Sequence, residues 1–406
     1  MPRRSGEGSA ARAPFEYEAL PSRVVFGVGA SDRLAGEVDR IGATRVLVVA
    51  SRDRAVRLRE RLGGRCAGIF TELRQHVPVE SAAAARGAAG ELDVDCLVAC
   101  GGGSAVGLAK AVALDRPVPV VALPTTYAGS EMTPVWGLTS GRRKQTGRDP
   151  RVAAAVVVYD PALTVTMPAR LTASSGMNAV AHCVEALYGP RANPVTALHA
   201  EEGLRRLASG LVASVRDPGG LEGRAEALLG AHLAGKALAV AGVAVHHQLC
   251  HVLGGALGLD HGGLNAVVLP HAARFVAPAV PAAMERVALA LGARGGDAAA
   301  ALYDLARRLG APASLAELGM AASELDRMAE TAAARVSPRP RPAGAAELRA
   351  LLAAAWAGGP PGPARRRAGR GGVVAVGGAE VSGAAARCTP PASGGTRPAP
   401  GRHGRS

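Results

Sequence analysis

Residues 97–134 read LVACGGGSAVGLAKAVALDRPVPVVALPTTYAGSEMTP, and this stretch decides the fold. An apolar run at 97–100 breaks at the glycines and serine of 101–104, and a helix-like run follows. A second apolar run at 118–123 breaks at 124–126. Glycines between a strand and a helix let backbone N–H groups approach an anion, which the helix N-terminus also favours. Two such strand ends side by side predict a site for a ligand that carries more than one phosphate.

The first part of the chain alternates short apolar runs with helical patterns, which is typical of a parallel sheet. Strands are predicted at 23–27, 46–50, 68–71, 96–100, 118–123 and 156–159, and helices near 31–41, 53–63, 80–91 and 104–114. The polar and basic segment 139–152 predicts a β-ribbon or a loop near the ligand cleft.

Beyond Pro161 the pattern changes to long alanine- and leucine-rich helices, and period-two alternation ends. Helices are predicted at 172–188, 194–215, 221–241, 243–256, 263–276, 281–293, 297–309, 322–335 and 344–357. The chain is therefore predicted to be an α/β protein. A Rossmann-like, parallel-sheet dinucleotide-binding domain spans 15–162, and an all-helical domain spans 163–357. Residues 1–14 are expected to be flexible, and the Gly-, Pro- and Arg-rich tail 358–406 to be disordered.

The net charge of +14 comes largely from the two ends of the chain. Residues 358–406 alone hold eight arginines and one glutamate, so the remainder is only mildly basic, as suits an enzyme with acidic ligands. No uncharged apolar run is long enough for a membrane span, and the first residues lack the apolar core of a secretory signal. The six cysteines form no CxxC pair, so a reducing, cytoplasmic setting is expected.

Histidines are concentrated in the helical part of the chain. Asn178 and His182 are four residues apart, as are His247 and His251, so each pair shares a helix face. His261 follows in a glycine-containing turn. Two such pairs with a turn histidine predict a metal site or a proton-transfer site between helices.

The residue types at this site argue against a tightly bound divalent metal. A hard or borderline metal prefers a carboxylate among imidazoles, whereas the first pair offers the uncharged amide of Asn178. If a metal were held, its ligands would be Asn178, His182, His247 and His261. Neutral histidines without a metal can still act as general acids near neutral pH.

Seven segments carry a family resemblance: FEYEALPSRVVFGVGA at 15–30, GGGSAVGLAKA at 101–111, PTTYAGSEMTPVWGLT at 124–139, TGRDPRV at 146–152, YDPALT at 159–164, SGMNAVAHCVEALYGPRANPVT at 175–196, and HHQLCHVLGG at 246–255 with DHGGLNAVVLPH at 260–271. In this order they resemble the iron-containing alcohol dehydrogenase superfamily, and most closely its maleylacetate reductases. The resemblance implies the architecture shared with dehydroquinate synthase.

Carried over by position, the resemblance assigns residues to each part of a site. The cofactor pyrophosphate would be held by Gly101, Gly102, Gly103 and Ser104, and the nicotinamide-ribose side lined by Thr125, Thr126 and Tyr127. An Asp and three His hold the metal in metal-dependent members, where this chain has Asn178, His182, His247 and His261. His251 takes the position thought to assist proton transfer. Asn178, and Gly107 where alcohol dehydrogenases usually have Asp, are both typical of maleylacetate reductases.

The resemblance implies reduction of the C=C bond of 2-maleylacetate to 3-oxoadipate by NADH or NADPH, a late step in the degradation of aromatic rings. His251, with His247 or His182, would supply the donor and the proton. Candidates for binding the dicarboxylate are Arg142, Arg143, Lys144, Arg148, Asn178 and His261. The resemblance also implies a homodimer.

Ser51 and Arg52 follow the predicted strand at 46–50, where an acidic residue would accept the ribose hydroxyls and repel a 2′-phosphate. Ser51 is therefore assigned to cofactor binding, and NADPH is expected to be accepted beside NADH. In the region 263–265, many maleylacetate reductases have a Glu and a second His where this chain has Gly263 and Asn265.

Three other readings remain at this stage. One is a metal-dependent alcohol or glycerol dehydrogenase, and another is a dehydroquinate synthase-like lyase. The third is an inactive paralogue whose basic tail binds nucleic acid. That tail has no aromatic residue on which a base could stack, so no nucleic acid partner is expected.

Overall fold

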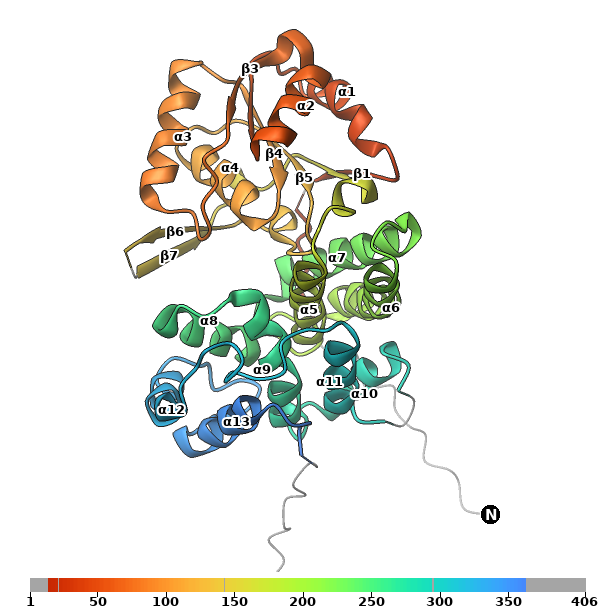
Figure 1. Ribbon diagram of the computed structural model, residues 1–406, viewed down its shortest axis with the longest axis vertical. Helices are drawn as coiled ribbons and strands as arrows, with labels where there is room; N and C mark the ends of the chain where they lie inside the picture. The colour runs from red at the N-terminus through yellow and green to blue at the C-terminus, as the bar shows by residue number, and fades with distance from the viewer. Residues whose placement is uncertain (1–13, 21, 142, 294–295, 363–406) are drawn as a thin grey trace, which may run out of the picture. The chain divides into compact units, whose positions relative to one another are not determined.

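The computed structural model describes residues 14–20, 22–141, 143–293 and 296–362. These residues form a parallel β-sheet domain followed by a helical domain, so the predicted fold class is confirmed (Figure 1). The segment 1–14 and the tail 358–406 fall almost wholly outside the described residues. Residues 358–362 are described, and the carbonyl of Gly358 accepts a hydrogen bond from Tyr303 Oη at 3.0 Å.

The sheet has the strand order β1-β8-β5-β4-β2-β3, with every neighbouring pair parallel. Its strands are β1 Arg23–Phe26, β2 Val46–Ala50, β3 Cys66–Phe70, β4 Cys96–Gly101, β5 Val120–Pro124 and β8 Val156–Tyr159. All six lie within two residues of the predicted strands. β5 starts later than predicted because Val118 N donates to Arg116 O in a tight turn.

Helices cover both faces of this sheet (Figure 1). α1 (Leu34–Arg40) and α2 (Arg52–Leu62) pack on one face, and α3 (Val79–Glu91) and α4 (Gly103–Asp115) pack on the other. Successive side chains of each strand therefore enter two different apolar cores. Burial on both faces explains why β2 and β4 are almost continuously apolar rather than alternating.

The direction in which successive strands are added to the sheet reverses between β2 and β4. The connection that leaves β2 passes to β3 on one side, whereas the connection that leaves β4 passes to β5 on the other. α2 and α4 consequently lie on opposite faces, and the carboxyl ends of the paired strands β2 and β4 form a topological switch point. Open α/β sheets bind their ligands at such a switch point.

An antiparallel hairpin follows β5 and matches the predicted β-ribbon. It consists of β6 (Val135–Ser140) and β7 (Arg143–Arg148). Thr139 in β6 donates its backbone N–H to Val77 O at 3.0 Å and its hydroxyl to His76 O at 2.8 Å. These bonds join the hairpin to the loop that precedes α3.

The helical domain contains nine α-helices within the described residues: α5 Ala169–Ala186, α6 Pro194–Arg216, α7 Leu221–Ala241, α8 Val245–Leu257, α9 His261–Val276, α10 Pro281–Ala290, α11 Ala298–Arg308, α12 Leu325–Ala333 and α13 Ala345–Ala357. Short 3-10 turns occur at Ala30–Arg33, Gly63–Arg65, Ser130–Met132, Pro150–Val152, Pro161–Thr164 and Ala322–Glu324. α5 is the central helix, because every residue from Thr172 to Ala186 is buried. No single described helix is long and apolar enough to cross a membrane; α7 and α8, bent by 95°, meet that test only as a pair.

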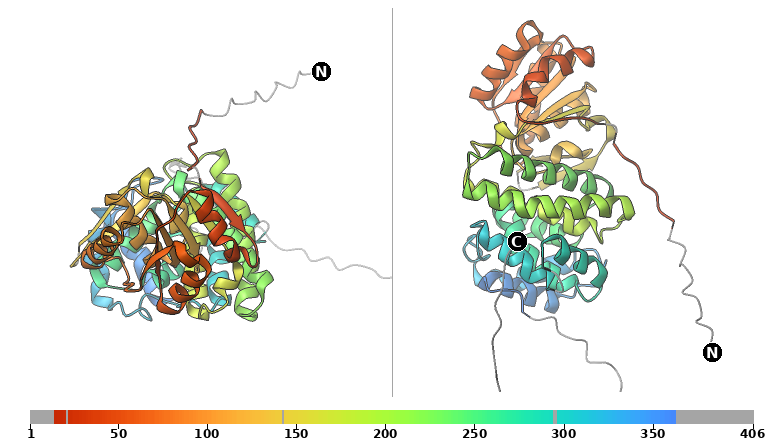
Figure 2. Two further views of the ribbon diagram at one scale, coloured as in Figure 1. Left: turned by 90° about the horizontal axis from the view of Figure 1, so that it is seen from above. Right: turned by 90° about the vertical axis from the view of Figure 1, so that its right-hand side faces the viewer.

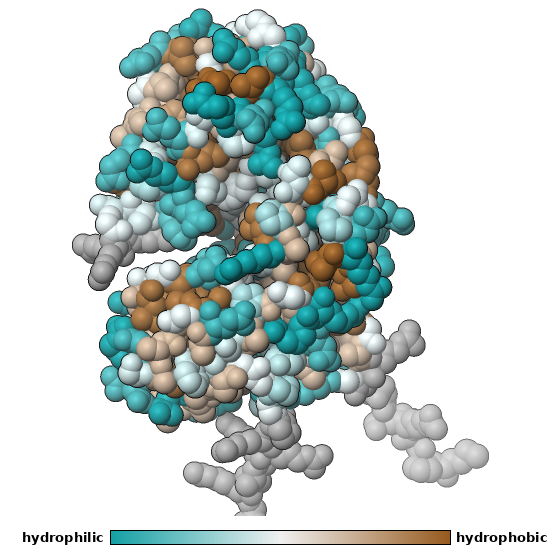
Figure 3. Space-filling model, in the orientation of Figure 1, coloured by the Kyte–Doolittle hydropathy of each residue, from teal (hydrophilic) through white to brown (hydrophobic). Residues whose placement is uncertain are grey.

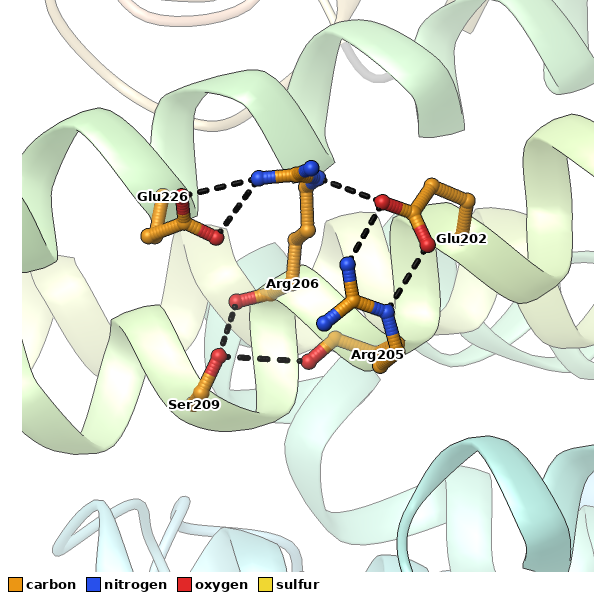
Figure 4. Close-up of polar contacts among 5 residues, drawn as sticks. All are labelled: Glu202, Arg205, Arg206, Ser209 and Glu226. Atoms are coloured by element: carbon orange, nitrogen blue, oxygen red, sulfur yellow. Dashed lines mark hydrogen bonds and ion pairs between the residues drawn. The ribbon is translucent and has the colours of Figure 1, made fainter.

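α6 and α7 pack side by side along most of their length (Figure 2). Their exposed edges are linked by Arg206, which pairs with Glu202 on its own helix at 2.6 Å and with Glu226 on α7 at 2.8 Å (Figure 4). Arg205 shares the Glu202 carboxylate. On the face shown in Figure 3, apolar residues form small separate patches, and the surface is indented where the sheet domain meets the helices.

Candidate active site

The glycine run lies at the carboxyl end of β4, at the switch point of the sheet. Gly102 is the N-cap of α4 and has no side chain with which to cap its N–H groups. A Cβ on Gly102 would lie 3.0 Å from Thr126 Cγ2, and one on Gly101 would lie 2.8 Å from Ala105 Cβ. Glycine therefore lets the two strand ends meet closely and leaves the start of α4 open to an anion. This cradle suits a pyrophosphate.

The end of β5 lies against the end of β4, as the sequence predicts. Thr125 N donates to Gly101 O at 3.1 Å, and the Thr125 side chain is buried. The Tyr127 ring differs from the expected role, because it is fully buried and its hydroxyl accepts a hydrogen bond from Arg224 Nη1 at 3.3 Å. The Tyr127 ring thus packs into the interior. Among the three residues Thr125, Thr126 and Tyr127, only Thr126 is partly exposed.

Ser51 and Gly107 belong to the helices that follow the paired strands β2 and β4. Ser51 is the exposed N-cap of α2, directly after β2, and its side chain makes no capping hydrogen bond. Gly107 lies one turn into α4, where a Cβ would be 3.0 Å from Val77 Cγ2. Val77 has a left-handed backbone at φ 49°, which is unusual for a β-branched residue. The missing side chain at position 107 makes room for Val77 against the cofactor helix.

The predicted histidines come together in a continuous row. The rings of His182 and His247 stack with centroids 4.7 Å apart, His247 and His251 are 6.3 Å apart, and His251 stacks on His261 at 5.8 Å. We call these four residues the histidine row. His182 and His247 are buried, whereas His251 is exposed, so the row runs from the interior to the surface.

Burial sets the protonation of the inner half of the histidine row. It lowers the pKa of both His182 and His247 well below the usual range, and the neighbouring imidazoles lower each further. Both rings are therefore neutral near pH 7. His182 Nδ1 is buried without a hydrogen-bond partner among the described residues, and it faces Gly129, where a Cβ would lie 3.7 Å away.

Glu185 is a site residue that the sequence reasoning missed. Its carboxylate is fully buried and contacts His247 Nδ1 at 2.7 Å. It also accepts backbone N–H groups from Ala244 at 2.9 Å and His246 at 2.7 Å, at the start of α8. A signal was present, because Asn178, His182 and Glu185 follow the i, i+4, i+7 spacing of one helix face.

The hydrogen bonds of Asn178 fix which nitrogen of His247 carries a proton. Asn178 Nδ2 donates to Ala128 O at 3.4 Å, so Asn178 Oδ1 is the atom that faces His247 Nε2 at 3.2 Å. Because Oδ1 can only accept, Nε2 must carry a hydrogen. Burial raises the pKa of Glu185. Since the neutral His247 ring carries its hydrogen on Nε2, the hydrogen between Glu185 and His247 Nδ1 belongs to Glu185. Both ring nitrogens of His247 are therefore hydrogen-bonded, Nδ1 to Glu185 and Nε2 to Asn178.

α9 begins earlier than predicted and changes the setting of His261. Asp260 caps the helix by accepting from Gly263 N at 2.7 Å, so His261 is the first helical residue rather than part of a turn. Asn265 donates to His261 O at 2.8 Å and contacts His246 Nε2 at 2.9 Å. Asn265 therefore links the start of α9 to α8, behind the histidine row.

The basic residues expected to bind substrate are only partly described. Arg142 and the side chains of Arg143 and Lys144 lie outside the described residues. Arg148, at the end of β7, donates from Nη2 to Ala239 O at 2.8 Å near the end of α7. Burial lowers the pKa of Arg148, and the nearby Arg191 lowers it further, so these two guanidinium groups form a positive region there.

The four would-be metal ligands do not fit a firmly held divalent ion. Asn178 offers an uncharged amide, and its oxygen accepts from His247 Nε2, the nitrogen whose lone pair a metal would need. Among the residues that the structure describes, no group of three His, Cys, Asp or Glu side chains is placed to hold a metal. The arrangement suits hydrogen bonding and proton transfer instead.

Sequence models of one family cover both domains. The model named "Iron-containing alcohol dehydrogenase" matches residues 21–161, and "Fe-containing alcohol dehydrogenase family, C-terminal" matches residues 172–356. The chain belongs to the iron-containing alcohol dehydrogenase family.

Within that family, its relatives include several maleylacetate reductases. The chain is 47% identical over 350 residues to the enzyme of Sphingobium indicum, covering 86% of this chain and 99% of the relative. It is 48% identical to maleylacetate reductase 2 of Cupriavidus pinatubonensis, covering 85% and 97%. The crystal structure of maleylacetate reductase from Rhizobium sp. strain MTP-10005 matches with a TM-score of 0.83 at 43% identity, covering 86% of this chain and all 100% of that one.

Asn178→Asp is expected to create a metal site. The carboxylate would complete a donor set with His182, His247 and His261, whereas the amide does not. After incubation with Zn²⁺ or Fe²⁺ and gel filtration, elemental analysis should find stoichiometric metal in the variant and far less in the parent protein. Asn193→Asp, at the N-cap of α6, adds the same charge elsewhere and serves as the control. Equal metal in parent and variant would contradict the interpretation.

Proposed function

We propose that this chain reduces the C=C bond of 2-maleylacetate to give 3-oxoadipate, with NADH or NADPH as the hydride donor. One observation carries the proposal: the structure combines the open glycine cradle at residues 101–104 with the histidine row. Beside that row, Asn178 provides an amide at the position where metal-dependent members have an acid. Several relatives at more than 40% identity are maleylacetate reductases, which supports the proposal.

The reaction makes two demands on the protein. The bound cofactor supplies a hydride to the alkene carbon β to the ketone, and the alkene electron pair moves toward the ketone to form an enolate. A hydrogen-bond donor must stabilise the enolate oxygen, and one proton must reach the α carbon. The products are then 3-oxoadipate and the oxidised cofactor.

The two halves of the histidine row fit these two demands. Glu185 and Asn178 fix the orientation of His247 Nε2–H in a buried setting, where hydrogen-bond donors are most effective. We propose that this hydrogen passes from Asn178 Oδ1 to the enolate oxygen when the substrate is bound. His251 is exposed and next to His247, so it can take a proton from solvent and deliver it. His182, stacked on His247, holds that ring in place.

We further propose that the reaction proceeds without a bound metal. The hydrogen bond from His247 to Asn178 supports this, because it places a hydrogen on His247 Nε2 that can be donated to the enolate oxygen, where metal-dependent members use a cation. No observation favours the alcohol dehydrogenase, lyase or nucleic-acid alternatives.

Substrate binding requires positive charge for two carboxylates. We propose that Lys144 and Arg148 on the β6–β7 hairpin supply part of it, with Asn178 and His261 on the helical side. The position of Arg148 beside α7 supports this. The five cysteines among the described residues are free thiols, which supports the proposed cytoplasmic location. The family resemblance supports a homodimer.

An NADH-oxidation assay with freshly prepared maleylacetate tests the proposed function. The expected result is consumption of NADH that depends on maleylacetate and is unchanged by a metal chelator. Simple alcohols with NAD⁺, as the alternative substrates, should give no comparable turnover. Chelator-sensitive oxidation of alcohols, with maleylacetate inert, would overturn the proposal.

His251→Gln is expected to lower kcat by roughly 10²–10⁴-fold, the usual contribution of a general acid. The KM values for maleylacetate and NADH should change little, because the cofactor cradle is untouched. His199→Gln, on α6 outside the histidine row, is the matched control and should retain full activity. Unchanged turnover of His251→Gln at saturating substrate would show that the proton comes from another group.

Ser51→Asp should shift the choice between cofactors. An acid at the end of β2 accepts the ribose hydroxyls and repels a 2′-phosphate, so kcat/KM with NADPH should fall by roughly tenfold or more while that with NADH is kept. Ser209→Asp adds the same charge on α6 and controls for net charge. Strict rejection of NADPH by the parent protein would contradict the prediction.

A further inference from the structure

Lys110 is a fully buried cation that the proposed reaction does not use. It lies on α4, seven residues after Gly103, on the same helix face as Gly103 and Gly107. Its ammonium nitrogen contacts three backbone carbonyl oxygens: Ser130 at 2.6 Å, Thr133 at 2.7 Å and Val135 at 2.9 Å. Three acceptors match the three donors of a charged ammonium.

The surroundings of Lys110 show why this charge is costly. Burial lowers the pKa of Lys110 to about 7, and the nearby charge of Glu131 opposes this shift. Glu131 is itself buried and accepts from Tyr159 Oη at 2.8 Å. Burying a cation and an acid is often no more stabilising than burying apolar side chains of the same volume. The three carbonyl contacts therefore point to a geometric role.

The segment that Lys110 holds continues directly into the active site. Residues 128–129 immediately precede the carbonyl of Ser130, and Ala128 O accepts from Asn178 Nδ2. Gly129 has a left-handed backbone at φ 75°, and a Cβ there would lie 3.5 Å from Gly235 Cα and 3.7 Å from His182 Nδ1. The segment 128–135 thus touches α4 on one side and the histidine row on the other.

We propose that Lys110 is a positioning residue that sets the distance between the cofactor cradle and the histidine row. It anchors segment 128–135 to the helix whose start forms the cradle, and the same segment orients Asn178 and borders His182. The inference rests on the proposed reductase function, in which hydride and proton must reach adjacent carbons of one substrate.

The test is Lys110→Met, which keeps the side-chain length and removes the three donors. We expect kcat with maleylacetate to fall roughly hundredfold, as for a misplacement of about 1 Å. The KM for NADH should change little, because Gly101–Ser104 is intact. Hydrogen exchange should become faster at the backbone amides of residues 128–135, with the rest of the sheet domain unchanged.

Three controls separate positioning from general destabilisation. Lys236→Met removes a lysine from α7 and should match the parent protein. Leu34→Ala truncates a fully buried side chain on α1, in the other core of the sheet, and should lower stability without changing kcat per folded molecule. Lys110→Met/Glu131→Gln removes both buried charges while keeping an acceptor for Tyr159, so it should recover stability but not turnover.

The outcomes are distinct. Parent-like kcat in folded Lys110→Met or in the double variant would overturn the proposal. Failure of both variants to fold with saturating NADH would also overturn it, because Lys110 would then act on folding rather than on the site. If the parent protein itself left maleylacetate unreduced, the proposed function would fail. Faster exchange confined to residues 128–135 would still support the anchoring role, and unchanged exchange there would overturn it.

Discussion

The buried carboxylate of Glu185 is the interaction on which the rest of the site depends. The N-cap residue of α8 is Ala244, whose methyl group cannot accept a hydrogen bond, so α5 supplies the cap through Glu185. A carboxylate at a helix N-terminus satisfies N–H groups and opposes the positive end of the helix dipole. The same carboxylate binds His247. One group therefore fixes both the start of α8 and the orientation of the His247 ring.

The contacts of Glu185 at the start of α8 also determine where the later residues of this helix lie. His251 lies one turn beyond His247, so fixing the first turn of the helix also fixes the exposed end of the histidine row. On the other side, Asn178 connects α5 to the carbonyl of Ala128 in the loop after β5. This hydrogen bond links the loop after β5, which lies beside the glycines at the end of β4, to the helices that carry the histidines.

Sequence patterns predicted the strands and helices well, because two-sided burial makes β2 and β4 uniformly apolar and the helices are long. They also predicted that His182, His247, His251 and His261 would meet. They missed Glu185, although its spacing places it on the same helix face as Asn178 and His182, because its partners on α8 lie far away in the sequence. The role of Tyr127 could not be predicted either, because its burial depends on Arg224, 97 residues away.

The residue at position 178 links the presence of a metal to local hydrogen bonding. Asn178 gives a hydrogen to the Ala128 carbonyl and takes one from His247, so both ends of its amide are used. An aspartate there would turn one acceptor oxygen toward another at Ala128 and would bury a negative charge. A divalent cation would offset both costs. An acid at this position therefore favours a metal, whereas an amide stabilises the site through hydrogen bonds alone and keeps a hydrogen on His247 Nε2.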